Sequence, residues 1–205
     1  MNIIQTNFKY QKDLIPLNLD KVFFIVLHHT ASITATPEQI HQWHLQAGFN
    51  GFGYNEYIKK DGTVYIGRGN HIGAQTKDMN SKSYGISVEG NYDLEREMPK
   101  AQFDSLVQRI KFNKARFKND VKVDNHSSFF PTSCPGKYFP FDTILDHVNN
   151  IQEDQLEKSI QALVNRKIII SPKYWNLYAR KGKTVKGEYA KLLIKNMASY
   201  INAQN

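Results

Sequence analysis

The sequence contains a single cysteine, Cys134, among its 205 residues. One cysteine cannot form an internal disulfide, and it cannot build a structural zinc site that needs several thiolates. The thiol is therefore free for metal or redox chemistry. Such sparse use of cysteine is typical of proteins that fold in a reducing compartment.

Long apolar runs are also absent. The densest run near the start, residues 22–27 (VFFIVL), is far shorter than the roughly 20 residues that a membrane-spanning helix needs. Residues 1–20 are too polar for the core of a signal peptide. We therefore expect synthesis in the cytoplasm without a signal peptide and no transmembrane segment. There is no internal repeat and no low-complexity tract.

The charge is basic and unevenly distributed. The chain carries a formal net charge of +8, with 40% hydrophobic and 22% charged residues, which is ordinary for a globular protein. Residues 151–205 hold ten Lys and Arg against four Asp and Glu, so +6 of the +8 lies in the last quarter. A basic segment of this kind favours a polyanionic partner such as a nucleic acid, an anionic lipid or an anionic wall polymer.

Strand and helix patterns alternate up to about residue 150. Residues 22–27 read as a buried strand that ends at His28, and Thr36 and Gln39 form a capping box around Pro37. Asp61-Gly62 predicts a hairpin turn. The remaining patterns predict strands at 84–88 and 121–123, a helix of 3.6-residue periodicity after Pro99, and a closing helix at 141–148. We predict an α/β fold with a mixed central sheet flanked by helices.

The helix that begins at Thr36 is expected to run to about Ala47. Its spacing predicts that Ile40, Trp43, His44 and Ala47 share one buried face.

Three parts are expected along the chain: an N-terminal arm (1–21), an α/β domain (22–150) and a basic helical C-terminal segment (151–205). Two apolar stripes predict helices in the last part, and residues 171–175 between them look like a turn. The segment is either a solvated helical extension or a cell-wall-binding module. In the second case these basic and aromatic residues would bind the wall: Lys173, Tyr174, Trp175, Tyr178, Arg180, Lys181, Lys183 and Lys186.

The chemistry is concentrated in two histidines and the cysteine. His28 ends the strand at 22–27, and His126 lies eight residues before Cys134. Two imidazoles and one thiolate are three ligands, and a catalytic zinc ion keeps its fourth position for water or substrate. His29 competes with His28 as the ligand, because neighbours on a strand point to opposite faces.

Several ordered motifs between Val22 and Val148 resemble the zinc-dependent N-acetylmuramoyl-L-alanine amidases, a family that includes phage lysozyme-like endolysins and peptidoglycan recognition proteins. The matching motifs are IVLHHTA around His28, QWH ending at His44, GY at Tyr54, KDGTV from Lys60, GRG around Arg68, NSKSYGISVEGN from Asn80, and HSSFFPTSCPG from His126.

The resemblance implies an enzyme that hydrolyses the amide bond between N-acetylmuramic acid and the L-alanine of the stem peptide. It implies one zinc ion per chain, held by His28, His126 and Cys134. Zinc lowers the pKa of its bound water toward about 7 and polarises a carbonyl. Tyr54 matches the catalytic tyrosine, and Thr132 stands where relatives carry Lys or Thr to stabilise the oxyanion.

Substrate contacts are implied for three further residues, His29, Thr30 and His44. His44 is alternatively a packed core histidine. Glu89 is read as a hydrogen-bonded structural carboxylate, while His41, His71 and His147 are read as surface or packing residues.

The chain departs from the patterns of relatives in three ways. The cytoplasmic recycling amidases carry a carboxylate in place of Ser87 and an aspartate ligand in place of Cys134, and animal recognition proteins usually carry a disulfide. The Ser87 and Cys134 differences favour the branch of endolysins and recognition proteins. The disulfide of animal recognition proteins is impossible with one cysteine, which points to a phage or bacterial lytic enzyme. Many relatives have histidine where this chain has Gln75, so a substrate contact by that histidine is lost or replaced here.

We therefore expect a lytic enzyme, endolysin-like and monomeric, that acts on bacterial peptidoglycan in the cell wall after release. Anionic wall polymers are expected partners of the C-terminal segment. The alternative is a recognition protein that binds peptidoglycan without cutting it, and Cys134 argues against it. Nucleic-acid binding is not expected, because the basic charge is the sole feature in its favour and no groove-reading or base-stacking motif accompanies it.

Overall fold

The computed structural model describes residues 1–180 and 182–203, with the side chains of residues 150–155 left aside. The chain divides into two compact units, Met1–Val148 and Asn149–Asn205. Within the described residues, no helix is long and apolar enough to cross a membrane.

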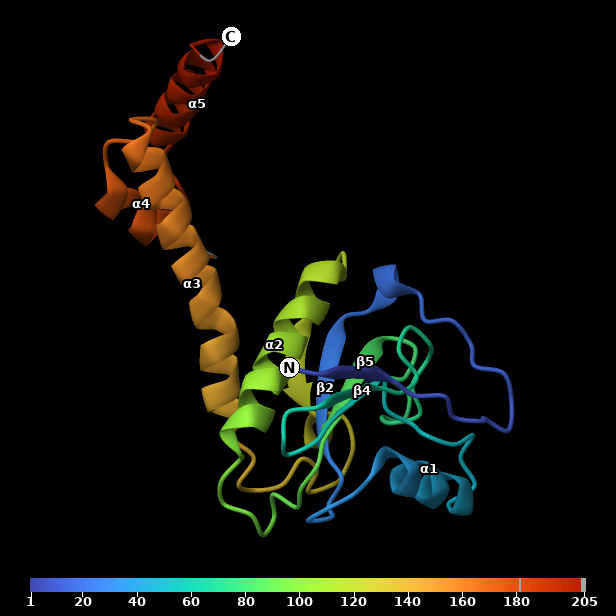
Figure 1. The fold of residues 1–205 in the computed structure, drawn as a ribbon. Helices are drawn as coiled ribbons and strands as arrows, with labels where there is room; N and C mark the ends of the chain where they lie inside the picture. Colours follow the sequence, from blue (N-terminus) through green and yellow to red (C-terminus); the bar gives the residue numbers. More distant parts are fainter. Residues whose placement is uncertain (181, 204–205) are drawn as a thin grey trace. The chain divides into compact units, whose positions relative to one another are not determined.

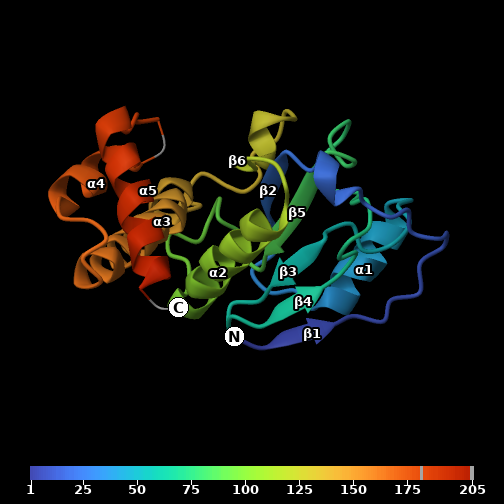
Figure 2. The same cartoon turned by 90° about the horizontal axis from the view of Figure 1, so that it is seen from above.

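The first unit is built on one six-stranded mixed sheet with the order β1-β4-β3-β5-β2-β6 (Figures 1 and 2). The strands are β1 (Ile3–Gln5), β2 (Phe24–His29), β3 (Glu56–Ile58), β4 (Val64–Ile66), β5 (Ser83–Val88) and β6 (Lys122–Asn125). Among these six strands, β3 and β4 are the one antiparallel pair, joined by the hairpin turn at Asp61-Gly62. Gly62 adopts a φ of +83°, which glycine accommodates without strain. The predicted α/β fold and this hairpin are confirmed.

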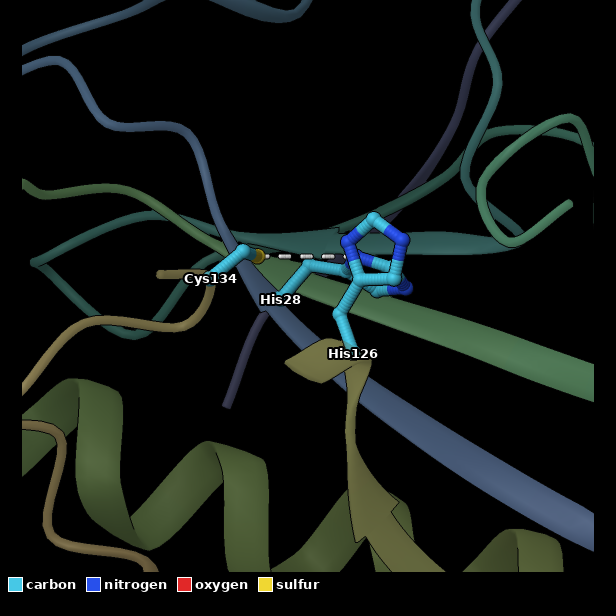
Figure 3. A group of neighbouring side chains, drawn as sticks. All are labelled: His28, His126 and Cys134. Carbon is cyan, nitrogen blue, oxygen red and sulfur yellow. Dashed lines mark hydrogen bonds between the residues drawn. The ribbon is translucent and has the colours of Figure 1, made fainter. Parts of the chain in front are cut away.

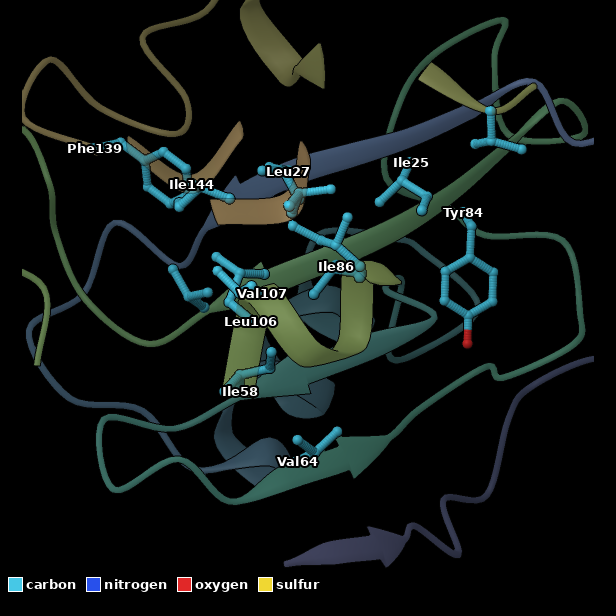
Figure 4. Packing of buried hydrophobic residues seen from close by; sticks show 14 of the residues in the cluster. Ile25, Leu27, Ile58, Val64, Tyr84, Ile86, Leu106, Val107, Phe139 and Ile144 are labelled. Atoms are coloured by element: carbon cyan, nitrogen blue, oxygen red, sulfur yellow. The ribbon is translucent and has the colours of Figure 1, made fainter. Parts of the chain in front are cut away.

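Two helices cover opposite faces of the sheet (Figure 2). Ile58 packs with Leu106 and Ile110 of α2 (Lys100–Arg116), whereas its neighbour Tyr57 packs with Ile40 of α1 (Pro37–Gln46). Because successive strand residues point to opposite faces, the two clusters lie on the two sides of the sheet. Figure 4 shows the larger cluster, in which branched side chains from β2, β5 and α2 fill the core.

A buried ion pair ties the sheet to α2. Arg109 donates to both carboxylate oxygens of Glu56, from Nε at 2.7 Å and from Nη2 at 2.6 Å. Tyr84 and Asn113 donate to the same carboxylate at 2.9 and 3.0 Å. A buried charge is tolerated when hydrogen bonds satisfy it in this way. Because these bonds form only when Arg109 and Asn113 face Glu56, they fix the position of α2 on the sheet.

The N-terminal residues, expected as an arm, are part of the first unit. β1 adds an edge strand parallel to β4, and Phe8 and Tyr10 pack against His41 of α1. This packing explains a wrong prediction about α1. Trp43 and Ala47 were expected to be buried, yet both are exposed, Trp43 at 42%. His41 is instead 5% exposed, because the N-terminal segment covers its face of the helix.

The closing helix is much longer than expected. α3 runs over Phe141–Asn165 as one helix, since the sequence offers no Gly or Pro to end it at residue 148. The boundary between the two units therefore falls within α3.

The second unit adds α4 (Pro172–Tyr178) and α5 (Gly187–Asn202) to the end of α3. Ile160, Ile168 and Ile169 form its small core with Trp175 packed against them. The prediction of a turn at residues 171–175 is wrong. Pro172 stands at the first position of α4, where its fixed φ suits a helix, and Trp175 is held in the core.

Candidate functional site

The ends of two adjacent parallel strands bring the two predicted histidine ligands together. Leu27 of β2 is paired with Asn125 of β6, so the next residues along each strand, His28 and His126, emerge at the same edge. Their ring centroids lie 4.5 Å apart. His126 opens a short 3-10 turn, His126–Ser128, which leaves its ring half-buried at the surface of the site.

Cys134 completes a three-residue cluster with these histidines (Figure 3). Its Sγ faces His28 Nδ1 at 3.7 Å, and one ligand atom from each residue lies within 4.8 Å of the others. Tetrahedral zinc bonds of about 2.0–2.3 Å place neighbouring N and S ligands roughly 3.5 Å apart. The His28–Cys134 pair fits this distance, and a small shift of the half-buried His126 ring would bring in the third ligand. The donor set therefore fits zinc.

The loop that carries Cys134 is anchored on both sides. Ser133 Oγ donates to Asp93 at 2.9 Å, and the Lys137 backbone N–H donates to the other oxygen of the same carboxylate at 3.1 Å. Gly136 has a φ of +103°, and a Cβ there would lie 2.5 Å from the backbone carbon of Tyr92. The close approach of these two backbones requires glycine and holds the sulfur in place.

Burial controls the protonation of the cluster. It lowers the pKa of His28 to about 3, with the nearby His126 acting in the same direction. Burial also lowers the pKa of His126 and raises that of Cys134 to about 11. Both imidazoles are therefore neutral at pH 7, as metal ligands must be, whereas the thiol must lose its proton when a metal binds.

Tyr54 lies beside the cluster, with its ring centroid 5.3 Å from that of His28. The preceding residue must be glycine, because a Cβ at Gly53 would lie 2.4 Å from the Ala74 carbonyl oxygen. Burial raises the pKa of Tyr54, and the Cys134 sulfur adds to the effect. The phenol therefore keeps its proton at neutral pH and is a hydrogen-bond donor.

Thr132 and His44 lie near these groups. The Thr132 hydroxyl accepts the backbone N–H of Cys134 at 3.2 Å, which leaves its own proton available. His44 Nδ1 accepts the Gly53 N–H at 3.0 Å, and its ring centroid is 5.4 Å from that of Tyr54.

His29 and Thr30, the other two expected substrate contacts, are engaged with the backbone. His29 is 5% exposed, and its Nδ1 accepts the Tyr92 N–H at 3.1 Å on the face opposite His28. Thr30 Oγ1 accepts the Gly90 N–H at 3.2 Å. Glu89 has the structural role that was expected, because it accepts backbone N–H groups from Ala35 and Lys60 at 2.9 Å each.

Comparison with known proteins places this geometry in a family. Residues 18–137 match the family described as N-acetylmuramoyl-L-alanine amidase. The chain belongs to this family.

Relatives of the amidase include lytic enzymes and recognition proteins. The structure of N-acetylmuramoyl-L-alanine amidase LysC from Clostridium intestinale URNW is similar, with a TM-score of 0.66 and 31% identity, covering 73% of this chain and 98% of LysC. Peptidoglycan-recognition protein SC1a of Drosophila melanogaster is 31% identical over 128 residues, 56% of this chain and 68% of that protein. The endolysin of Klebsiella phage KP32 is 30% identical over 116 residues, 52% of this chain and 76% of that protein.

A pocket of about 480 Å³ opens beside the cluster in this amidase. His126 lines both the pocket and the cluster, so a bound molecule would lie next to the candidate metal. The sequence did not indicate the other lining residues, which include Phe49, Gln75, Thr76, Lys77 and Phe130. Their positions in the chain follow no periodic pattern, and only Gln75 had drawn attention, as a departure from relatives.

The buried histidines predict that the metal-free protein loses stability as the pH falls. In the unfolded chain their pKa is about 6.5, against about 3 for His28 and about 4 for His44 in the folded protein. The free energy of unfolding is therefore highest above about pH 6.5 and falls toward pH 4. Each histidine lowers it by up to about 1.4 kcal/mol per pH unit. Urea unfolding with a chelator between pH 4 and pH 7.5 measures the slope.

A matched pair of variants isolates one histidine. In His44→Asn the amide oxygen can accept the Gly53 N–H but does not titrate, so the slope should become shallower. His147→Asn, at an exposed position of α3, is the matched control for exchanging a histidine for an asparagine. An unfolding free energy independent of pH between 4.5 and 6.5 would contradict this account.

Proposed function

We propose that this protein is a zinc-dependent peptidoglycan hydrolase that cleaves the amide bond between N-acetylmuramic acid and L-alanine, acting as a lytic enzyme on the cell wall. The observation that carries the zinc dependence is the convergence of His28 Nδ1, a His126 nitrogen and Cys134 Sγ. Three protein ligands leave one position for a reacting group, which is the arrangement of a hydrolytic and not a structural zinc site. Membership of the amidase family supports the bond that is cut.

Each nearby residue has a part in this proposal. Zinc, when bound, supplies an activated water and polarises the scissile carbonyl. The protonated Tyr54 hydroxyl donates a hydrogen bond to the oxygen on which negative charge develops. Thr132 keeps its loop in place by accepting the Cys134 N–H and offers its own proton to the same oxygen. The pocket beside His126 holds the substrate against these donors.

A second candidate function is peptidoglycan recognition without cleavage, which the similarity to recognition proteins makes plausible. The ligand set favours hydrolysis over this alternative. A pure binding site has no need of a partly buried thiol whose sulfur faces an imidazole nitrogen at 3.7 Å. Three neutral protein ligands that leave a fourth coordination position vacant are the arrangement of a zinc ion that takes part in a reaction.

Mass spectrometry of digested peptidoglycan tests the proposal. The full-length protein with zinc should release stem peptides that begin with a free L-alanine amine, and glycan strands that keep the lactyl carboxyl. Cys134→Ser should lose zinc and cleavage together, because a hydroxyl is a poor zinc ligand at neutral pH. Cys134→Asp restores an anionic ligand and should recover part of both. Products cut within the glycan or within the peptide would contradict the proposal.

Tyr54→Phe should lower the turnover number by roughly a hundredfold, which is typical of losing one donor to a developing oxyanion. Its zinc content and melting temperature should stay close to those of the wild type. Tyr65→Phe is the matched control, because it removes a tyrosine hydroxyl from β4 outside the cluster. Full turnover in Tyr54→Phe would show that the hydroxyl has no part in the reaction.

The C-terminal unit is proposed to hold the enzyme on anionic wall polymers. Its exposed lysines include Lys173, Lys183 and Lys186, whereas Lys181 lies outside the described residues. The aromatic residues are divided between two roles. Trp175 packs in the core, and Tyr174 stacks on Tyr189 with ring centroids 3.6 Å apart. Of the three proposed sugar-binding aromatic residues, Tyr178 is the exposed one, at 39%.

Replacing Lys173, Lys183 and Lys186 by Gln should weaken binding to purified walls on the order of tenfold at low salt, since each cation near an anionic surface contributes up to about 1 kcal/mol. The loss should shrink as salt shortens the screening length to about 8 Å at physiological ionic strength.

Two comparisons complete this test. Cleavage of a small soluble muropeptide should not change in the triple variant. The matched control replaces three exposed lysines of the first unit, Lys9, Lys12 and Lys21, by Gln for the same change in net charge. Equal loss of wall binding in both triple variants would mean that overall charge, and not the C-terminal unit, binds the wall.

A further inference from the structure

Gln75 lies with its side chain against the His28 ring. Its side chain is 9% exposed, and its Oε1 lies 2.6 Å from His28 Nε2, on the side of the ring opposite the Cys134 sulfur. We propose that Gln75 is a positioning residue that fixes His28 in the tautomer whose free lone pair lies on Nδ1, facing the metal position. This inference rests on the proposed zinc-dependent function.

The direction of each hydrogen bond follows from a chain of three groups. The Met79 carbonyl oxygen can only accept, so the Ser83 hydroxyl must use its single proton there, at 2.8 Å. Ser83 Oγ is then an acceptor toward Gln75, and the group that faces it at 3.0 Å must be the amide Nε2. The hydrogen bonds therefore determine the orientation of the Gln75 amide.

The other end of the amide then determines the tautomer. With Nε2 directed at Ser83, the Gln75 Oε1 faces His28, and a carbonyl oxygen can only accept a proton. His28 must therefore carry its N–H on Nε2. A neutral imidazole has one N–H, so Nδ1 keeps its lone pair and directs it toward Cys134 Sγ at 3.7 Å.

The Gln75 side chain has little freedom to leave this position. A Cβ on Gly85 would lie 2.5 Å from the Gln75 Cδ, and one on Gly73 would lie 2.9 Å from its Cγ. The Gln75 backbone N–H donates to Asn80 Oδ1 at 2.9 Å, and the Thr76 hydroxyl lies 2.5 Å from Oε1. Two glycines thus make room for a side chain that the surrounding hydrogen bonds then hold.

The expected effect is on zinc affinity before any chemistry occurs. Residues that hydrogen-bond the distal nitrogen of a metal-binding histidine typically change affinity by about 10- to 100-fold. Gln75→Leu leaves the buried His28 N–H without an acceptor and should weaken zinc binding within this range. Gln75→Glu keeps an acceptor at the same place and should bind zinc about as tightly as the wild type.

One full-length control separates positioning from stability. Val107→Ala removes methyl groups from the core on the opposite face of the sheet, so it should lower the melting temperature without changing zinc affinity. Competition with a chromophoric chelator measures affinity in the absence of peptidoglycan. A protein that binds zinc as expected but releases no stem peptides would overturn the proposed function and leave this inference standing.

Nitrogen NMR of the metal-free protein observes the tautomer directly. Long-range proton–nitrogen spectra of histidine-labelled wild type should show His28 protonated on Nε2 at neutral pH. Ser83→Ala frees the amide to rotate, so a population protonated on Nδ1 should appear. The inference is overturned if wild-type His28 is protonated on Nδ1, or if Gln75→Leu binds zinc as tightly as the wild type.

Discussion

The parallel pairing of β2 with β6 on one side and β5 on the other is the constraint on which the site depends. It aligns the ends of three strands at one edge, so that His28 and His126 meet although 97 residues separate them in the chain. A shift of one residue in the β2–β6 register would turn every side chain of the shifted strand to the other face. The core beneath β2 prevents such a shift, because Ile25 and Leu27 must point into it for His28 to point away.

Burial gives the site its chemical character. The same low-polarity surroundings that lower the pKa of His28 also raise the pKa of Cys134, so the ligands are neutral without metal. A cation that enters can displace the thiol proton. Its attraction to the resulting thiolate is strong because solvent screens the pair only weakly in these surroundings. Without metal, the neutral ligands avoid the cost of an unpaired buried charge. The thiolate forms only when zinc binds and balances its charge.

Strands β2 to β6 and the hairpin could be predicted from sequence because each depends on a local pattern, whereas β1 was not predicted. The three clustered residues were predicted from the single cysteine together with the family resemblance. The single cysteine restricts the possible ligands, and a short apolar run places His28 and His29 at the end of a strand, but the choice of His28 and His126 rested on the resemblance to the family. The contact between Gln75 and His28 could not be predicted, since it joins residues 47 positions apart through the fold. Likewise, the buried face of α1 depends on Phe8 and Tyr10, which no periodicity within that helix reveals.

Zinc K-edge X-ray absorption of the full-length protein tests the central claim most directly, because it counts the donor atoms around the metal without reference to activity. The account predicts two imidazole nitrogens at about 2.0–2.1 Å, one sulfur at about 2.3 Å and one further light atom from solvent. In Cys134→Asp the sulfur should vanish and an oxygen should replace it. A wild-type spectrum without sulfur, or with four protein ligands, would contradict the account.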